Sequence, residues 1–233
     1  MIADGLRSWR ERRRISQLEL ALRAGTTQRH VSFIERGRSV PGRGMVIRLA
    51  EALDVPLRER NALLLSAGYA AVYSETPLEQ LAPLRRALDR VLDGHLPYPA
   101  VLTDGQGLLV AANAGFDALL GGAPEPGANV ARLLLEALGE RIVNRAEWGR
   151  HVIDAVRARG LDAAALSALV PEEPPGDAHL GYAVPLRLRD PDMTLLTTLT
   201  HFGTAIDVTV AELTLEAFLP ADEATERAFR PLG

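Results

Sequence analysis

Apolar residues recur every three or four positions along residues 4–70, and this spacing predicts about five short helices. The first runs from about Asp4 to Arg13, with Leu6 and Trp9 facing inward. The fourth keeps the i, i+3, i+4, i+7 repeat most plainly, at Val46, Leu49, Ala50 and Leu53. Because each helix has an apolar face to bury, the pattern predicts an all-helical N-terminal domain.

Capping residues indicate where these helices begin and end. Ser16 precedes the second helix, and Thr26 and Thr27 precede the third, where a hydroxyl in the N-cap position accepts a backbone N–H. Gly25 and Gly37 follow the same two helices, where a residue that tolerates positive φ is favoured. Two short helices joined by a tight glycine-containing turn form the core of a helix-turn-helix. We therefore expect residues 1–72 to form a DNA-binding domain of this kind.

The third helix, Gln28 to Arg36, has two different faces. Val31 and Ile34 lie on one side, suited to a core, and an opposite polar arc holds Gln28, Arg29, Ser32, Glu35 and Arg36. Gln can pair with adenine, Arg with guanine, and Ser with phosphate or either base. The first three of these side chains lie in the N-terminal half, the part that meets base edges. Glu35 is expected to tie helices together rather than to contact DNA.

Further contacts with DNA are expected around this helix. Gln17 begins the preceding helix, whose N-terminal N–H groups and dipole attract phosphate. Arginines that flank the third helix should add sequence-independent attraction to the DNA backbone. The complete set of predicted DNA-binding residues is Gln17, Thr27, Gln28, Arg29, Ser32, Arg36, Arg38 and Arg43.

From His95 onward the pattern changes to that of a mixed domain. Runs at 100–103 and 108–112, separated by a turn at 104–107, predict a β-hairpin. Helices are predicted near 113–120, 130–138, 145–159 and 162–170, and strands at 182–188, 194–202 and 207–218. Turns at 190–192 and 203–204 make the last three strands antiparallel neighbours. Residues 95–233 are therefore expected to form an α+β domain with one antiparallel five-stranded sheet.

Residues 73–94 connect the two predicted domains. Within them, Leu78 to Leu92 has helical apolar spacing, with Arg85, Arg86 and Arg90 on other faces. Two interpretations are open at this point: a linking or dimerising helix, or a helix that covers the second domain.

Composition narrows the class of protein. Apolar residues make up 47% of the 233 and charged residues 24%, so a sizeable core can be buried. With no cysteine, disulfides, thiolate metal sites and cysteine nucleophiles are excluded. The first residues are charged, without the apolar segment of a secretory signal, and no apolar run suits a membrane span, so we expect a soluble cytoplasmic protein.

Charge is divided unevenly along the chain. Residues 1–70 hold 13 arginines against 7 acidic residues, a net charge of +6, whereas the remainder has a net charge of -10. Lysine does not occur, so every one of these cations is an arginine. A basic N-terminal segment on an acidic body suggests a polyanionic partner for that segment alone.

Catalytic and cofactor motifs are missing from the sequence. It has no G-x-S-x-G, phosphate-binding G-x-x-x-x-G-K or H-E-x-x-H motif, and its five histidines never pair at metal-ligand spacing. We therefore expect no catalytic activity, no bound metal and no cofactor.

The N-terminal pattern resembles the phage-repressor/Cro (XRE) family of helix-turn-helix domains. The resemblance rests on residues 16–21, Ala24-Gly25, residues 31–38 and Pro41. It implies binding to double-stranded operator DNA, with Gln17 on phosphate and with Gln28, Arg29 and Ser32 reading bases.

The second domain is similar to the MmyB/MltR-type ligand-binding domain, which has a PAS-like fold. The resemblance rests on residues 95–100, Asp104, Ala112-Asn113, residues 129–134 and residues 144–148. It implies an apolar pocket for a fatty-acid or lipid-like effector. The predicted polar contacts to that ligand are His95, Tyr98, Asn113, Arg132, Asn144 and Trp148. The family's usual Trp after the central Asn is Arg145 here.

Together these features predict a ligand-responsive, sequence-specific transcriptional regulator that acts as a homodimer. Its expected partners are operator DNA and a small lipophilic effector, and no membrane. The alternative is a DNA-binding regulator whose C-terminal domain is a protein-interaction or dimerisation platform without a small-molecule ligand.

Overall fold

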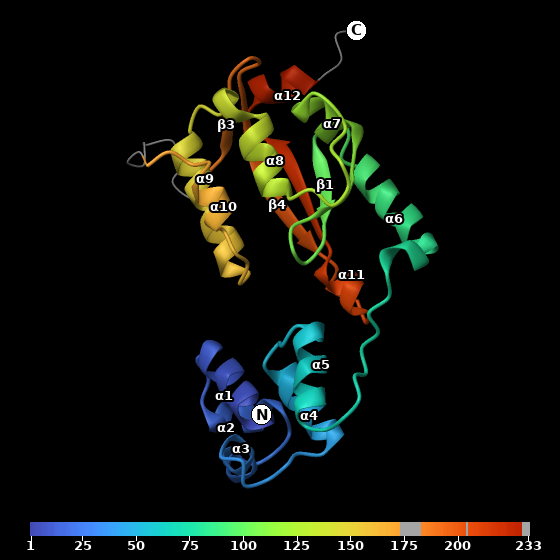
Figure 1. The fold of residues 1–233 in the computed structure, drawn as a ribbon, viewed down its shortest axis with the longest axis vertical. Coiled ribbons are helices and arrows are strands. Elements are labelled where there is room, and N and C mark those ends of the chain that lie inside the picture. The colour runs from blue at the N-terminus through green and yellow to red at the C-terminus, as the bar shows by residue number, and fades with distance from the viewer. Residues whose placement is uncertain (173–182, 204, 230–233) are drawn as a thin grey trace. The chain divides into compact units, whose positions relative to one another are not determined.

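The computed structural model describes residues 1–172, 183–203 and 205–229 (Figure 1). The chain divides into two compact units. The first unit comprises Met1–Pro77 with Gly203–Ala211, and the second comprises Leu78–Phe202 with Glu212–Gly233. Each has its own apolar core.

Helices form the first part of unit 1, as the periodicity predicts. They are α1 (Ile2–Arg12), α2 (Gln17–Arg23), α3 (Gln28–Glu35), α4 (Arg43–Ala52) and α5 (Leu57–Ser66). Each contributes buried apolar residues to one core, among them Leu6, Leu20, Ile34, Leu49 and Leu64. Ser16 and Thr27 are confirmed as N-caps, because Ser16 Oγ accepts the Glu19 N–H at 3.0 Å and Thr27 Oγ1 accepts the His30 N–H at 3.2 Å. Thr26 is not the cap of α3; its Oγ1 lies 3.0 Å from His30 Nδ1.

A later segment joins this unit through hydrogen bonds to residues 74–76. Thr76 donates its backbone N–H and its hydroxyl to Asp207 Oδ2, at 3.1 and 2.7 Å. The Val208 N–H donates to the Ser74 carbonyl at 2.7 Å. Through these bonds the segment Gly203–Ala211 belongs to the first unit, although the strands before and after it in the sequence belong to the sheet of the second.

A single antiparallel five-stranded sheet forms the centre of unit 2, which confirms the predicted fold class. Its strands are β1 (Ala100–Thr103), β2 (Leu109–Ala112), β3 (Leu186–Leu188), β4 (Met193–His201) and β5 (Thr214–Pro220). Their spatial order is β2-β1-β5-β4-β3, so the first and last strands of the sequence are neighbours. Register places Glu216 of β5 opposite Val101 of β1 on one side and Leu199 of β4 on the other.

Each face of the sheet has its own apolar cluster. Val101 and Phe218 face a core with residues of α7 (Ala114–Leu120), α8 (Val130–Ala137), α9 (Arg145–Ala158) and α10 (Ala164–Ser167). Helix α6 (Ala82–Asp93) runs beside the sheet (Figure 1). On the opposite face, its Leu88 and Leu92 pack against strand residues that include Ala100 and Leu102. The helix predicted within residues 73–94 therefore covers the second domain, the second of the two interpretations left open by the sequence.

One strand prediction is wrong at its start. Residues 207–218 were expected to be a single strand, but Val208–Glu212 form helix α11 and β5 begins at Thr214. The cause is local, because Asp207 Oδ1 accepts the N–H groups of Thr209 and Val210 at 2.9 and 3.4 Å. A side-chain acceptor at a helix N-terminus outweighs the strand preference of these β-branched residues.

The strand predicted at 182–188 is shorter in the structure, as β3, and its first position, Tyr182, lies outside the described residues. Helix α12 (Glu223–Phe229) follows β5 and was not predicted. Asp222 Oδ1 accepts the Thr225 N–H at 2.7 Å, which fixes its first turn. None of the helices in the described part of the chain combines the length and apolar character that a membrane span requires.

Candidate functional site

Helix α3 has one buried and one exposed side, as its sequence predicts. Val31 and Ile34 are each 1% exposed and belong to the core of unit 1. Gln28 and Arg29 are exposed and Ser32 is half-buried. The predicted base-reading residues thus lie on the surface of a helix whose inner face is fixed by packing.

Phe33 lies between two arginines on this helix. Arg29 Cζ is 5.2 Å from the centre of the Phe33 ring, and Arg36 Cζ is 5.5 Å from it. The Arg36 Nε–H also donates to the Ser32 carbonyl at 3.1 Å. Because an aromatic face attracts a guanidinium group, the half-buried ring restrains both arginines.

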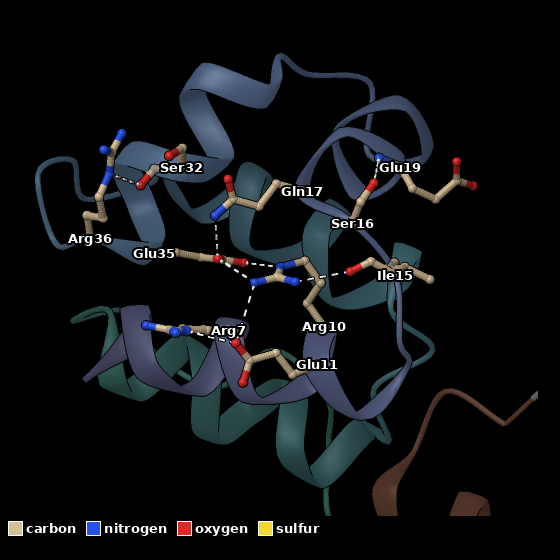
Figure 2. A network of polar contacts seen from close by, with 10 residues as sticks. All are labelled: Arg7, Arg10, Glu11, Ile15, Ser16, Gln17, Glu19, Ser32, Glu35 and Arg36. Carbon is tan, nitrogen blue, oxygen red and sulfur yellow. Dashed lines mark hydrogen bonds and ion pairs between the residues drawn. The ribbon is translucent and has the colours of Figure 1, made fainter.

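A buried carboxylate joins α3 to the two helices before it (Figure 2). Glu35, whose side chain is 3% exposed, accepts from Arg10 Nε at 2.7 Å and from Arg10 Nη2 at 2.9 Å. Gln17 Nε2 donates to the same carboxylate at 2.8 Å. The Glu35 hydrogen bond raises the pKa of Arg10. Glu35 therefore ties α1, α2 and α3 together, as expected, and fixes how α3 is presented.

Gln17 was predicted to bind phosphate, and the structure shows one of its amide N–H groups used by Glu35. A primary amide carries two N–H donors, so the phosphate contact stays a prediction. Thr27 caps α3 with its hydroxyl and is exposed. Arg36, Arg38 and Arg43 are exposed at or beyond the end of α3, in positions that suit contacts to a DNA backbone.

In unit 2, the predicted ligand contact Asn113 makes four hydrogen bonds within the protein. Its Oδ1 accepts the N–H groups of Ala100 and Phe116, each at 3.0 Å. Its Nδ2 donates to the carbonyls of Leu92 and Tyr98 at 3.1 and 3.0 Å. The side chain is buried and holds the entry of β1, the start of α7 and the end of α6 together.

Asn144 is also used internally, since its Nδ2 donates to the Pro185 carbonyl at 2.8 Å and its Oδ1 accepts the Arg187 N–H at 3.1 Å. Trp148, one helical turn later, is 2% exposed and belongs to the core. These two residues lie together at the start of α9, as the Trp148 N–H donates to the Asn144 carbonyl.

The other three predicted ligand contacts also interact within the protein. The Tyr98 ring packs edge-on against Phe229 with 5.5 Å between ring centres. His95 Nδ1 lies 2.8 Å from the Val91 carbonyl oxygen. Arg132 is on an exposed face of α8 and its Nε–H donates to Glu136 at 2.8 Å. Contact of any of the six residues with a ligand stays a prediction.

Glu216 is an acidic group that the sequence analysis did not single out. It lies on the sheet face that also carries Phe218, and burial raises the pKa of its carboxyl group to about 7, against the opposing effect of the Arg159 guanidinium. In the described ranges, no group of three or more histidine and acidic side chains is placed to hold a metal ion.

Comparison with known proteins places these features in a family. Residues 84–232 match the family described as MmyB-like transcription regulator ligand binding domain. The chain belongs to the MmyB-like family. Residues 6–60 match the helix-turn-helix family. This MmyB-like chain therefore combines a helix-turn-helix region with a domain of the transcription-regulator ligand-binding family.

Among curated relatives is an uncharacterized HTH-type transcriptional regulator, y4dL, of Sinorhizobium fredii, 46% identical over 56 residues. The match covers 24% of this chain and 29% of y4dL, so the MmyB-like chain spans less than a third of that relative. Among solved structures is the restriction-modification controller protein C.AhdI from Aeromonas hydrophila, at 32% identity and a TM-score of 0.25. That match covers 25% of this chain and 86% of C.AhdI.

Two charged residues of this MmyB-like chain were not identified by the sequence analysis. Arg10, the partner of Glu35, is 25 positions away in sequence, and only the packing of α1 against α3 brings them together. Glu216 could have been identified from the sequence, since strand alternation places it on the same face as the apolar Phe218. An acidic residue on the apolar face of a central strand is uncommon enough to be a candidate site.

Proposed function

We propose that this regulator binds operator DNA as a homodimer through α3 and changes its DNA affinity when the MmyB-like domain binds a small lipophilic molecule. The observation that carries the proposal is the exposed polar face of α3, held on a packed core by Glu35. In a dimer, the two α3 helices would read half-sites about 34–36 Å apart, one turn of DNA. The ligand can act in this way only if it binds one arrangement of the protein more tightly than another.

Fatty-acid-like molecules are the first effectors to examine, because the sequence resembles domains suspected to bind them. Mass spectrometry of an organic extract of the purified protein would identify a co-purifying lipophilic molecule. Fluorescence anisotropy on an operator selected from random DNA would then measure affinity with and without it. A stoichiometric ligand that leaves operator affinity unchanged would contradict the proposal.

Arg29→Ala should weaken binding to the selected operator by about 1–3 kcal/mol and relax base preference, since Arg29 is assigned to a base edge. Arg38→Ala should weaken binding to operator and random DNA evenly, because a phosphate contact carries no sequence information. The two variants are matched controls for each other in an anisotropy titration at fixed salt. Equal losses on both DNAs for Arg29→Ala would show that α3 does not read bases through this residue.

Phe33→Leu should weaken operator binding by about 1 kcal/mol while both arginines remain, because the ring orients them through cation–π contacts. The slope of log affinity against log salt should stay unchanged, since no cation is lost. Arg36→Ala, in contrast, should reduce that slope by about 1. A reduced slope in Phe33→Leu would indicate that the helix surface itself had changed.

A second candidate is that the C-terminal domain is a platform for protein interaction. It is favoured by the closely packed part of the sheet face under α7 and α8, where Phe116 and Phe218 are fully buried and Trp148 nearly so. A protein that carries no extractable ligand, and whose operator binding responds to no lipophilic molecule, would support this alternative.

A further inference from the structure

The sheet of unit 2 has one stretch of edge that is both unpaired and exposed in the described part of the chain. One outer strand, β2, is covered at Leu109, whose N–H donates to the Ala128 carbonyl at 2.8 Å, and its other residues are half-buried. The other outer strand, β3, is covered as well, since the Val143 N–H donates to the Arg187 carbonyl at 2.8 Å. The uncovered stretch belongs to β4, which extends past β3.

This open edge consists of residues 197–201. Strand β3 pairs with residues 193–195 of β4, whereas the pairing of β4 with β5 on its other side continues in one register to His201. All five residues of the open edge are exposed. Among the described residues, none forms a backbone hydrogen bond with the outer side of this stretch. The end of β4 therefore has a neighbouring strand on one side and solvent on the other.

One hydrogen bond shows which backbone groups of β4 point outward. The Ala221 N–H donates to the Thr194 carbonyl at 2.8 Å, so Thr194 directs its backbone groups toward the β5 side. In an antiparallel ladder, successive residues alternate in the side to which their N–H and C=O groups point. Thr197, Leu199 and His201 therefore direct both groups to the open edge. Each offers one donor and one acceptor to a further strand.

The open edge lacks the features that protect natural strand edges. Charged side chains, a proline or a bulge usually prevent such an edge from pairing with another chain. Residues 197–201 are Thr-Thr-Leu-Thr-His, with no acidic residue, arginine or proline, and their register against β5 has no bulge. Threonine also favours the extended conformation. The stretch is therefore suited to the addition of a strand through main-chain hydrogen bonds.

A second copy of the chain fits this edge. A strand edge is complementary to itself, because a two-fold axis through it pairs identical residues of two copies in the antiparallel direction. Residues 71–233 have a net charge of -10, so like charges oppose the approach of two copies elsewhere on this unit. The open edge has no acidic residue, so two copies meet there without like charges facing each other across the strands.

We propose that residues 197–201 pair with the same residues of a second copy, with Leu199 opposite Leu199, and join the two sheets into one. Leu199 is the middle residue of the open edge, and its side chain, 56% exposed, would pack against its counterpart. The inference rests on the proposed homodimer and assigns its interface. Five paired residues are few beside the about 1,200–2,000 Å² of a stable interface, so the dimer should dissociate on dilution and be reinforced by operator DNA.

Single-cysteine variants test the pairing directly, because the chain has no cysteine of its own. In the proposed register the two Leu199 Cα atoms are about 5.5 Å apart, as in any hydrogen-bonded antiparallel pair. A disulfide spans about 4.4–6.8 Å between Cα atoms, so the full chain with Leu199→Cys should form a covalent dimer on mild oxidation. Val143→Cys is the matched control, since Val143 is 49% exposed and lies on the covered edge of the same sheet. It should cross-link about tenfold more slowly or less, because its thiols meet only by collision.

Leu199→Pro tests whether the main chain carries the pairing. Proline has no N–H, and the Leu199 N–H faces the open edge, so the folded monomer loses no hydrogen bond of its ladder. Sedimentation velocity of the full chain at increasing concentration should show a dimer weakened about tenfold or more. Leu199→Thr keeps the N–H and the strand preference and should remain dimeric. Circular dichroism of Leu199→Pro should match that of the unaltered chain.

The outcomes separate the interface from the homodimer itself. A dimeric chain in which Leu199→Cys cross-links no faster than Val143→Cys, or whose dimer survives Leu199→Pro, would overturn the proposal and leave the homodimer in place. A chain that stays monomeric at every concentration and also on operator DNA would overturn both. Rapid cross-linking of Leu199→Cys together with loss of the dimer in Leu199→Pro is the result that we expect.

Discussion

Glu35→Ala should destabilise the first unit by about 3–5 kcal/mol, because it removes the carboxylate that neutralises the Arg10 guanidinium and accepts the hydrogen bond of the Gln17 amide. The Glu35 side chain is 3% exposed and that of Arg10 13%, so water cannot readily replace the lost carboxylate. Loss of this group also frees α3 from α1 and α2, so operator affinity should fall together with stability.

Urea unfolding of the full chain can measure this effect, since the two tryptophans, Trp9 and Trp148, lie in different units. A Trp148→Phe background leaves Trp9 of α1 as the reporter. Glu19→Ala is the control: it breaks an exposed ion pair with Arg23, 2.8 Å apart, and should change stability by less than about 1 kcal/mol. A loss for Glu35→Ala no greater than that of Glu19→Ala would mean that the buried network contributes little.

Asn113→Ala should destabilise the second unit by about 3–5 kcal/mol, because four backbone groups lose their hydrogen-bond partner at a site that is 2% exposed. Asn113→Asp should destabilise the unit at least as much as Asn113→Ala, because it places a buried carboxylate oxygen against the Leu92 and Tyr98 carbonyl oxygens. A Trp9→Phe background makes Trp148 the reporter for this unit.

Asn129→Ala provides the comparison, since Asn129 only caps α8 through the Arg132 N–H at 3.0 Å and should cost about 1 kcal/mol. If Asn113→Ala unfolded at the same urea concentration as the unaltered chain but lost ligand, the residue would belong to the ligand site and its structural role would be minor.

Local signals were read correctly from the sequence because their causes lie within a few residues. Ser16 and Thr27 cap helices whose first N–H groups are three positions away. The failed start of β5 also has a local cause, but there two local preferences compete, and the Asp207 cap prevails over the strand preference of Val208 and Thr209.

Contacts between distant segments could not be predicted in the same way. Asn113 was a candidate ligand contact because it belongs to a motif that resembles the MmyB/MltR-type domain. Its bond to the Leu92 carbonyl depends on how α6 packs against the sheet. Arg132 suited a carboxylate by charge alone, whereas its partner in the structure is Glu136, one turn away on the same helix. Chemistry of a side chain indicates what it can bind, and packing decides what it meets.

The cations on and beside α3 are all arginines, and this limits how the cell can control the interface. Acetylation, which neutralises lysine side chains, has no side-chain target in this sequence, because lysine does not occur in it. Guanidinium groups also keep their charge across the physiological pH range. In the proposed function, neither lysine acetylation nor titration of these cations would change the positive charge that α3 presents to DNA, and the ligand would act on where the helix is held.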